Sequence, residues 1–286
     1  MYKLLSAEFI RLWKSFVFRL ALCFSAGLGS FVVLMRWMDV KQNAKIYAEL
    51  GPEYKNADGL IFVGGIYLIF AAAVFIGIFV GTEYGDGTIR NKLAVGHQRR
   101  SIYLSKLAVC GTACLLMHLL YIIVSLIMGK MLLGGTTMQA DEMLLFTAAG
   151  MTAMLAMAAI LLLISMSVQS KAAGSVICLL LTMILLFAAL TIWQRLSAPK
   201  YHEEYAYLNE ETGEVIKGEK EENPKYLSGI KRKIYEFLND FIPVSQLYQI
   251  VLNDAGHLGR IMVYDCLIVL LTAGAGIVIF EKKDLK

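Results

Sequence analysis

Long apolar runs recur six times along the chain, separated by polar segments. Each run reaches the length of about 20 residues that a helix needs to cross the hydrocarbon core of a bilayer. The pattern therefore predicts an all-α integral membrane protein with a single transmembrane domain over residues 1–286. Its six predicted spans cover approximately 17–38, 60–83, 107–133, 143–168, 172–193 and 261–280.

The segment before the first run mixes apolar and charged side chains. Leu4, Ile10 and Trp13 alternate with basic residues such as Lys3 and Arg11. A helix with this composition suits the boundary between headgroups and acyl chains. We predict an interfacial elbow helix over residues 1–15 that leads into the first span.

A polar stretch, 194–260, separates the fifth and sixth predicted spans and is rich in Glu, Lys and Tyr. We expect a mobile hairpin or loop over 203–222. Further on, Ile234, Phe237 and Phe241 recur at helical spacing until Pro243, which ends the pattern. This second half is either a short helix on or in the membrane surface, or a solvated loop with a few core residues of its own.

Orientation follows from the Lys and Arg residues of the short connections, because these residues are retained on the cytoplasmic side. One side carries Lys3, Arg11, Lys14, Arg19, Arg90, Lys92, Arg99, Arg100, Lys106, Lys171, Lys282, Lys283 and Lys286, and the other carries Arg36, Lys41, Lys45, Lys55 and Lys130. Thirteen against five predicts that both termini and the loop 84–105 are cytoplasmic, and that the loop 194–260 is extracellular.

Composition agrees with a lipid-facing surface. Hydrophobic residues make up 58% of the chain and charged residues 17%, too few charges for the surface of a soluble domain. The net charge of +4 comes from short basic clusters between apolar runs, not from one basic patch with aromatic residues between. We therefore expect a lipid bilayer as surroundings and no nucleic acid as partner.

Enzyme signatures are missing from the sequence. The four His residues stand in separate segments, and no catalytic, metal or cofactor motif is present. Polar residues inside spans are costly in lipid and so are functional candidates. His118 lies near the middle of the third span, where an interhelical hydrogen bond is the expected role. Asp265 lies near the start of the sixth span, where we expect hydration from the outer face and a gating or packing role.

The most informative segment is 81–106, which reads GTEYGDGTIRNKLAVGHQRRSIYLSK. Asp86, Gly87 and Thr88 supply turn and cap chemistry, residues 89–95 can form two helical turns, and Gly96 is a natural stop. Ile89 and Leu93 share one helix face. Such a helix suits docking into a groove on another protein. Contact with anionic lipid headgroups fits its basic residues equally well.

This segment resembles the cytoplasmic loop of the permeases of type 2 ATP-binding-cassette exporters. The resemblance extends to the elbow helix, the six spans, the large outer loop and the tail from Phe280 to Lys286. It implies that loop 84–105 holds a coupling helix that contacts an ATPase subunit. The contact candidates are Glu83, Gly87, Thr88, Arg90, Lys92, Leu93 and Arg99. The segment ending in Pro243 resembles the outer re-entrant region near the exit gate.

The resemblance implies a permease subunit in a bacterial cytoplasmic membrane. Two ATPase subunits would bind ATP and Mg²⁺, so this chain would need no cofactor and would not be an enzyme. A second permease copy or a homologue would complete the pathway for a peptide, drug or lipid-like substrate, as in bacitracin or lantibiotic immunity or multidrug efflux. The alternative is an ATP-independent sensor or scaffold whose extracellular loop binds a peptide.

Overall fold

A computed structural model describes residues 2–51, 55–201, 206–208, 215–217 and 222–284. Six of its helical segments are long and apolar enough to cross a membrane, which confirms the predicted number of spans. The membrane helices are α2 (Phe16–Gln42), α5 (Gly64–Gly85) with the short α4 (Asp58–Ile61) before it, α7 (Arg99–Leu133), α8 (Ala140–Ser167), α9 (Lys171–Leu196) and α12 (Leu258–Lys282).

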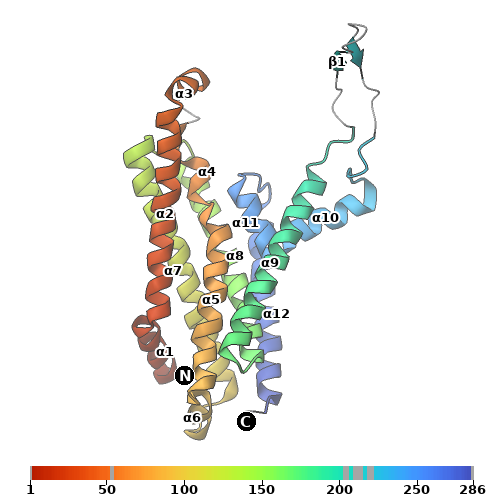
Figure 1. Cartoon of the computed structure of the whole chain (residues 1–286). Coiled ribbons are helices and arrows are strands. Elements are labelled where there is room, and N and C mark those ends of the chain that lie inside the picture. Colours follow the sequence, from red (N-terminus) through yellow and green to blue (C-terminus); the bar gives the residue numbers. More distant parts are fainter. Residues whose placement is uncertain (1, 52–54, 202–205, 209–214, 218–221, 285–286) are drawn as a thin grey trace.

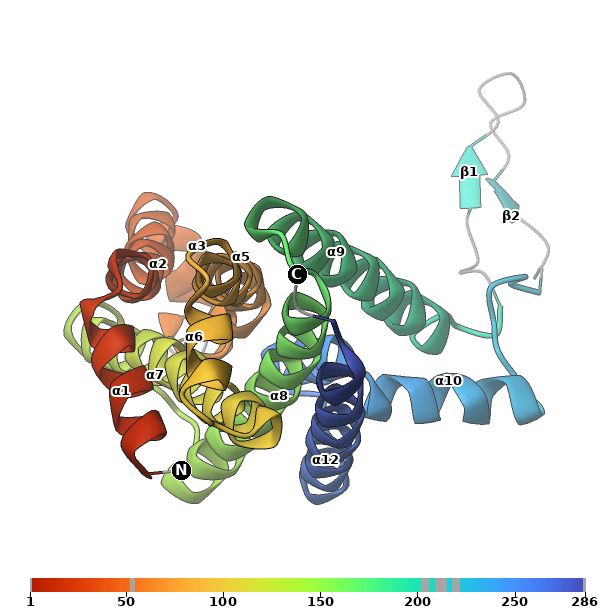
Figure 2. The ribbon, with the colours of Figure 1, turned by 90° about the horizontal axis from the view of Figure 1, so that it is seen from below.

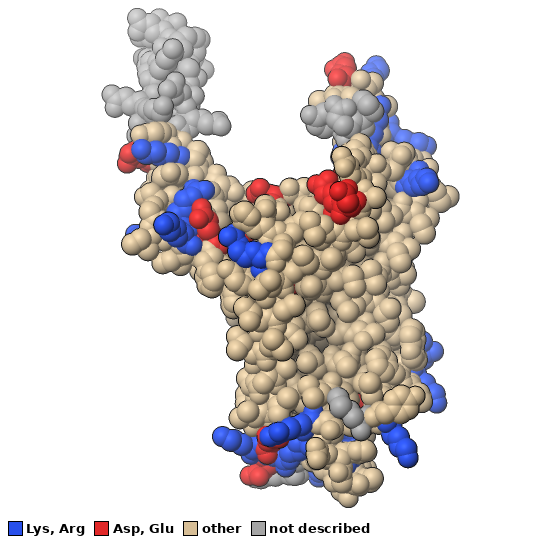
Figure 3. Space-filling view, turned by 180° about the vertical axis from the view of Figure 1, so that it is seen from behind, with Lys and Arg blue, Asp and Glu red and all other residues tan. Residues whose placement is uncertain are grey.

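The membrane helices run roughly side by side, so the bundle has two distinct ends (Figure 1). One end carries both chain termini, α1 (Tyr2–Lys14) and α6 (Thr88–Ala94), and we call it the terminal end. The opposite end carries α3 (Ala44–Leu50), and we call it the far end. In Figure 3, Lys, Arg, Asp and Glu side chains gather near both ends and leave an apolar band between them. This is the distribution that a bilayer requires.

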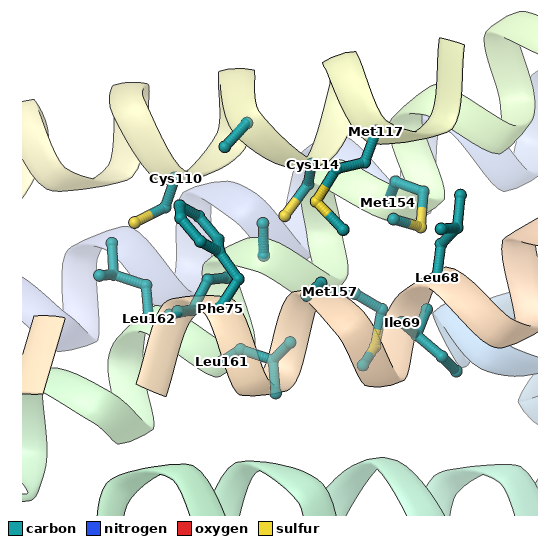
Figure 4. Packing of buried hydrophobic residues seen from close by; sticks show 14 of the residues in the cluster. Leu68, Ile69, Phe75, Cys110, Cys114, Met117, Met154, Met157, Leu161 and Leu162 are labelled. Carbon is teal, nitrogen blue, oxygen red and sulfur yellow. The ribbon is translucent and has the colours of Figure 1, made fainter. Parts of the chain in front are cut away.

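The centre of the bundle consists of α5, α7 and α8. In their most apolar windows, 61%, 50% and 56% of the residues are buried, against 28% for α2 and 22% for α9 and α12. Small and sulfur-containing side chains fill the centre (Figure 4): Cys114 and Met117 of α7 lie toward Met154 and Met157 of α8, and Cys110 lies beside Leu162 and Phe75. The outer three helices therefore present most of their surface to lipid or to a partner.

Two glycines let α5 and α9 approach closely. A Cβ atom on Gly77 would lie 2.6 Å from the Cα of Ser175, and one on Gly81 would lie 2.5 Å from the Cα of Lys171. The glycines are four residues apart and so share one helix face, as in close crossings of membrane helices. This pair of glycines was not among the features predicted from the sequence.

The stretch 194–260 contains more structure than expected. Strands β1 (Ala206–Leu208) and β2 (Val215–Lys217) pair antiparallel, while residues 203–205, 209–214 and 218–221 of the expected hairpin or loop lie outside the described residues. Helix α10 (Gly229–Phe241) projects sideways from the bundle (Figure 2). Helix α11 (Pro243–Val251) is mostly buried and packs against α8 and α9. The interpretation as a solvated loop is therefore wrong for α11.

Helix boundaries differ from the predicted ones where charged residues are involved. Helix α2 continues to Gln42, and α7 begins at Arg99 instead of near residue 107. Pro243 is the first residue of α11. An N–H group at this position has no intrahelical acceptor, so the N–H that proline lacks costs no hydrogen bond. It therefore separates α10 from α11 without interrupting either helix.

Candidate functional site

Helix α6 protrudes from the terminal end between α5 and α7 (Figure 1). Gly87 precedes it with a φ of 67°, a left-handed conformation that costs glycine little. Ile89 is buried in the core, whereas Arg90 and Val95 are exposed, Val95 by 81%. Gly96, with a φ of 96°, ends the helical segment. Helix α6 thus has one face anchored in the protein and one face free.

Five charged side chains from four helices meet beside α6, and we call them the ion cluster. They are Glu8 and Arg11 of α1, Glu83 of α5, Lys92 of α6 and Lys106 of α7. Lys92 Nζ donates to Glu83 Oε1 at 2.8 Å and also to Glu8. Lys106 Nζ lies 2.5 Å from both Glu8 Oε2 and Glu83 Oε1. Arg11 pairs with Glu83 as well.

Burial makes the ion cluster strong and sensitive to change. The side chains of Glu8, Glu83 and Lys106 are 1%, 2% and 0% exposed. Charges in such surroundings interact strongly, and removing one partner leaves another charge uncompensated, at a cost of about 3–5 kcal/mol. The ion cluster therefore holds α6 firmly to α1, α5 and α7.

The ion cluster keeps the Glu8 carboxylate charged. Burial by itself would raise its pKa, but the charges of Lys106 and Lys92, together with their hydrogen bonds, outweigh burial and lower the pKa below its ordinary value of 4.5. The charged carboxylate thus stabilises the folded state at neutral pH. This contribution is lost as the pH falls from 4.5 through the lowered pKa of the folded protein.

We expect acid to destabilise the protein partly through Glu8. Thermal unfolding in detergent, followed between about pH 7 and about pH 3, should show a steeper loss of stability for the wild type than for Glu8→Gln, whose side chain does not titrate. Glu49→Gln is the matched control, because Glu49 is exposed. It should keep the wild-type pH dependence. An unchanged pH dependence in Glu8→Gln would contradict the role of the ion cluster.

Side chains also cap the helix ends at the terminal end. Arg99 Nη1 donates to the carbonyl oxygens of Phe280 at 2.8 Å and Glu281 at 3.2 Å. Lys283 Nζ donates to those of Met166 at 2.9 Å and Ser167 at 2.6 Å. Cations are favourable at such helix C-termini, whose carbonyl groups lack intrahelical partners. Residues 280–283 therefore tie α7, α8 and α12 together.

The predicted contact residues fall into three groups. Glu83 and Lys92 point into the ion cluster, and Arg99 binds the end of α12. Gly87, Thr88 and Leu93 are half-buried, with Leu93 against the core. Arg90 alone of the seven is exposed and lies on the free face of α6. The free face also includes Asn91, Ala94 and Val95, which were not among the predicted contacts.

Inside the bundle, Asp265 of α12 joins α8 and α11. Its side chain is buried, so the expected hydration from the outer face is wrong. Oδ2 accepts a hydrogen bond from Thr152 at 2.7 Å, and Gln246 of α11 lies next to it. Gln246 in turn donates to the backbone oxygen of Asp240 at 2.8 Å. These contacts fix the position of α11 relative to two membrane helices.

His118 occupies a niche between helices. It is buried close to Gly65 of α5 and Gly150 of α8, with Leu247 of α11 nearby. Neither ring nitrogen has a hydrogen-bond partner among the described residues. The expected interhelical hydrogen bond is therefore not formed in this structure. No group of three or more His, Cys, Asp or Glu side chains in the described part of the chain could hold a metal ion.

Three residues that complete the ion cluster were not predicted as site residues: Glu8, Arg11 and Lys106. All three stand at edges of apolar runs, where charged residues usually reach water. One signal was available: Glu8 is the single acidic residue among the basic residues of 1–15. Arg11 follows it at helical spacing, but its lysine partners, Lys92 and Lys106, stand 84 and 98 residues away, so helical spacing does not identify them.

A family model described as "ABC-2 family transporter protein" matches residues 4–189, more than half of the chain. The matched region includes most of α1, the whole ion cluster and α6. No curated protein and no solved structure matches the chain.

Proposed function

The chain belongs to the ABC-2 family of transporter proteins, and from this we propose that it is the permease subunit of an ATP-driven exporter. It forms the membrane pathway, while separate ATPase subunits bind ATP with Mg²⁺ and carry out hydrolysis. This chain itself performs no catalysis in the proposal. Alternating access requires that events at the ATPase change the packing of the membrane helices.

The observation that carries the proposal is the anchoring of α6. Its free face, with Arg90 and Val95, is available to a partner, while Lys92 on the same short helix is bound to Glu8 and Glu83. A displacement of α6 therefore acts directly on α1, α5 and α7 through buried charges. These are the properties that a coupling helix needs.

The assembly we propose contains two ATPase subunits and two permeases, either two copies of this chain or this chain and a homologue. Helices α2, α9 and α12, which bury least within the chain, offer surface for the second permease. The basic residues around the terminal end support a cytoplasmic location for both termini in a bacterial plasma membrane. Helix α1 would then lie at the inner interface as an elbow.

Export of a peptide, drug or lipid-like substrate is the proposed activity, with peptide-antibiotic immunity or multidrug efflux as the physiological setting. Helix α11 supports a gate at the far end, because it enters the bundle and begins at Pro243. Asp265 and His118 contact α11 or its neighbours and are the polar candidates for controlling it.

We expect Val95→Asp to weaken association with the ATPase encoded nearest to this chain. A charge buried at an apolar contact costs several kcal/mol when unpaired, so the amount that co-purifies in detergent should fall at least about tenfold. Ile230→Asp is the matched control, because Ile230 is 78% exposed on α10, away from α6. It should leave association unchanged.

Val95 is a sharper test than Leu93, because a charge at half-buried Leu93 would also disturb the core. Equal melting temperatures of the two variants and the wild type would show that folding is intact. Association unaffected by Val95→Asp would exclude the free face of α6 as the contact. If no ATPase associates with folded wild-type protein, the exporter proposal fails and an ATP-independent sensor or scaffold takes its place.

A further inference from the structure

Two buried oxygen atoms lack hydrogen-bond donors where α8, α11 and α12 meet. Asp265 of α12 is almost completely buried, and its Oδ1 atom has no hydrogen-bond partner among the described residues. Gln246 of α11 is completely buried, and its Oε1 atom also has no partner there. The two side chains lie next to each other. Because buried polar atoms are as a rule hydrogen-bonded, the pair requires a further donor.

The neighbouring donors are already in use. Gln246 Nε2 donates to the backbone oxygen of Asp240 at 2.8 Å, and an amide turned the other way would place its own oxygen against that carbonyl group. Thr152 of α8 has one hydroxyl hydrogen, but two acceptors lie within its reach: Asp265 Oδ2 at 2.7 Å and the backbone oxygen of Ala149 at 2.9 Å. The missing donor is therefore a hydrogen on the carboxyl group itself, because a protonated carboxyl group has one O–H to donate.

The charge around Asp265 leads to the same conclusion. The two side chains that interact with its carboxyl group, one on α8 and one on α11, are both uncharged. Asp240 of α10 pairs with Arg260 instead. His118 of α7 lies against glycines of α5 and α8 and does not act on the carboxyl group. A buried carboxylate without a compensating cation is unfavourable, and such a group takes up a proton and becomes neutral.

We propose that Asp265 is a proton-binding site, whose carboxyl group is protonated at neutral pH and donates a hydrogen bond from Oδ1 to Gln246 Oε1. One proton then gives both atoms a partner. It also joins α11 to α12, since α11 packs mainly against α8 and α9. Loss of the proton places a carboxylate against the amide oxygen, and the repulsion between these acceptors loosens α11. The site rests on the packing of these helices, and its meaning for transport rests on the proposed gate at α11.

The first test is infrared spectroscopy of the full chain in detergent at neutral pH. The wild type should show the C=O stretching band of a protonated carboxyl group, and Asp265→Asn, which has nearly the same shape, should lose it. Asp254→Asn is the matched control, because Asp254 is exposed just beyond α11, and it should keep the band. Gln246→Leu should shift the band to higher frequency, because the carboxyl group then lacks its acceptor. A spectrum of Asp265→Asn equal to that of the wild type would overturn the proton site, and an unshifted band in Gln246→Leu would overturn the hydrogen bond.

The second test is hydrogen–deuterium exchange of the backbone N–H groups of α11. At neutral pH the wild type and Asp265→Asn should exchange alike, because a protonated carboxyl group and an asparagine amide can each donate to Gln246. At alkaline pH the wild type should exchange about fivefold faster than Asp265→Asn, the effect of roughly one hydrogen bond. Asp254→Asn should follow the wild type at both pH values. Equal exchange in the wild type and Asp265→Asn at alkaline pH would overturn the control of α11 by this proton.

Both measurements are independent of the exporter proposal, because neither involves an ATPase or a transported substrate. The α11 sequence is the same in the wild type, Asp265→Asn and Asp254→Asn, so the intrinsic exchange rates of their N–H groups cancel in the comparison. The melting temperature at neutral pH checks that each variant is folded.

Discussion

Glu83→Gln is expected to lower the free energy of unfolding by about 3–5 kcal/mol, although the side chain keeps its shape. The reason is the balance of charge in the ion cluster. Glu83 pairs with Arg11, Lys92 and Lys106, and without its charge these three cations share Glu8 alone. Buried like charges repel each other strongly in such surroundings. Function should fall as well, because α6 loses one of its two ionic links to the bundle.

The measurement is thermal or denaturant-induced unfolding in detergent, together with ATP hydrolysis by the assembled transporter. The double variant Glu83→Gln, Lys106→Met removes one cation with the carboxylate and should recover part of the lost stability. Arg232→Gln is the control, since its pair with Glu236 is solvent-exposed on α10 and such pairs contribute only about 0–1 kcal/mol. Equal effects of Glu83→Gln and Arg232→Gln would contradict the structure of the ion cluster.

Gly77→Leu should be the most disruptive substitution in the membrane region. The leucine Cβ would meet the backbone of Ser175, with Cα at 2.6 Å and N at 2.9 Å, so α9 would have to move away from α5. Overpacking of a core typically costs about 1–3 kcal/mol. Because the leucine would meet backbone atoms, which cannot change rotamer, we expect the loss in free energy of unfolding to reach or exceed the upper end of this range. We expect poor yield of folded protein and a lowered melting temperature.

Gly274→Leu is the matched control for this prediction. Gly274 is also a helical glycine in an apolar span, but nothing lies within 4 Å of its added Cβ atom. Its replacement should leave the melting temperature nearly unchanged, and size-exclusion chromatography gives a second readout of folding. A wild-type melting temperature for Gly77→Leu would mean that α5 and α9 are farther apart than described.

The membrane helices were predictable because lipid demands a long apolar run for each one. The start of α7 was not predictable in this way. Arg99 and Lys106 stand before the apolar residues and so lie outside the predicted span, yet they are helical because Arg99 caps α12 and Lys106 is paired in the ion cluster. Compensation of charge by distant residues overrides the hydropathy pattern, and one sequence does not reveal those partners.

The candidate site was also predictable only in part. Helix α6 was predictable, because Gly87, the apolar positions and Gly96 are local signals. Which of its faces is free depends on tertiary contacts. Lys92 was predicted as a contact with an ATPase subunit, but Glu8 and Glu83 hold it against the bundle. The ionic partners that the fold supplies therefore decide which charged residues of this short helix remain available to another protein.

The caps at the terminal end also set an order of events during biosynthesis. Membrane helices can insert one after another as the chain emerges. The carbonyl groups at the end of α8, however, lack their hydrogen-bond donor until Lys283 is synthesised, 117 residues after Met166. Arg99 likewise waits for α12. The earlier helices thus remain incompletely joined at this end until translation has passed residue 283. A ribosome that stalls before that point would leave inserted helices without the hydrogen bonds that join their ends. We expect membrane quality control to degrade such a product.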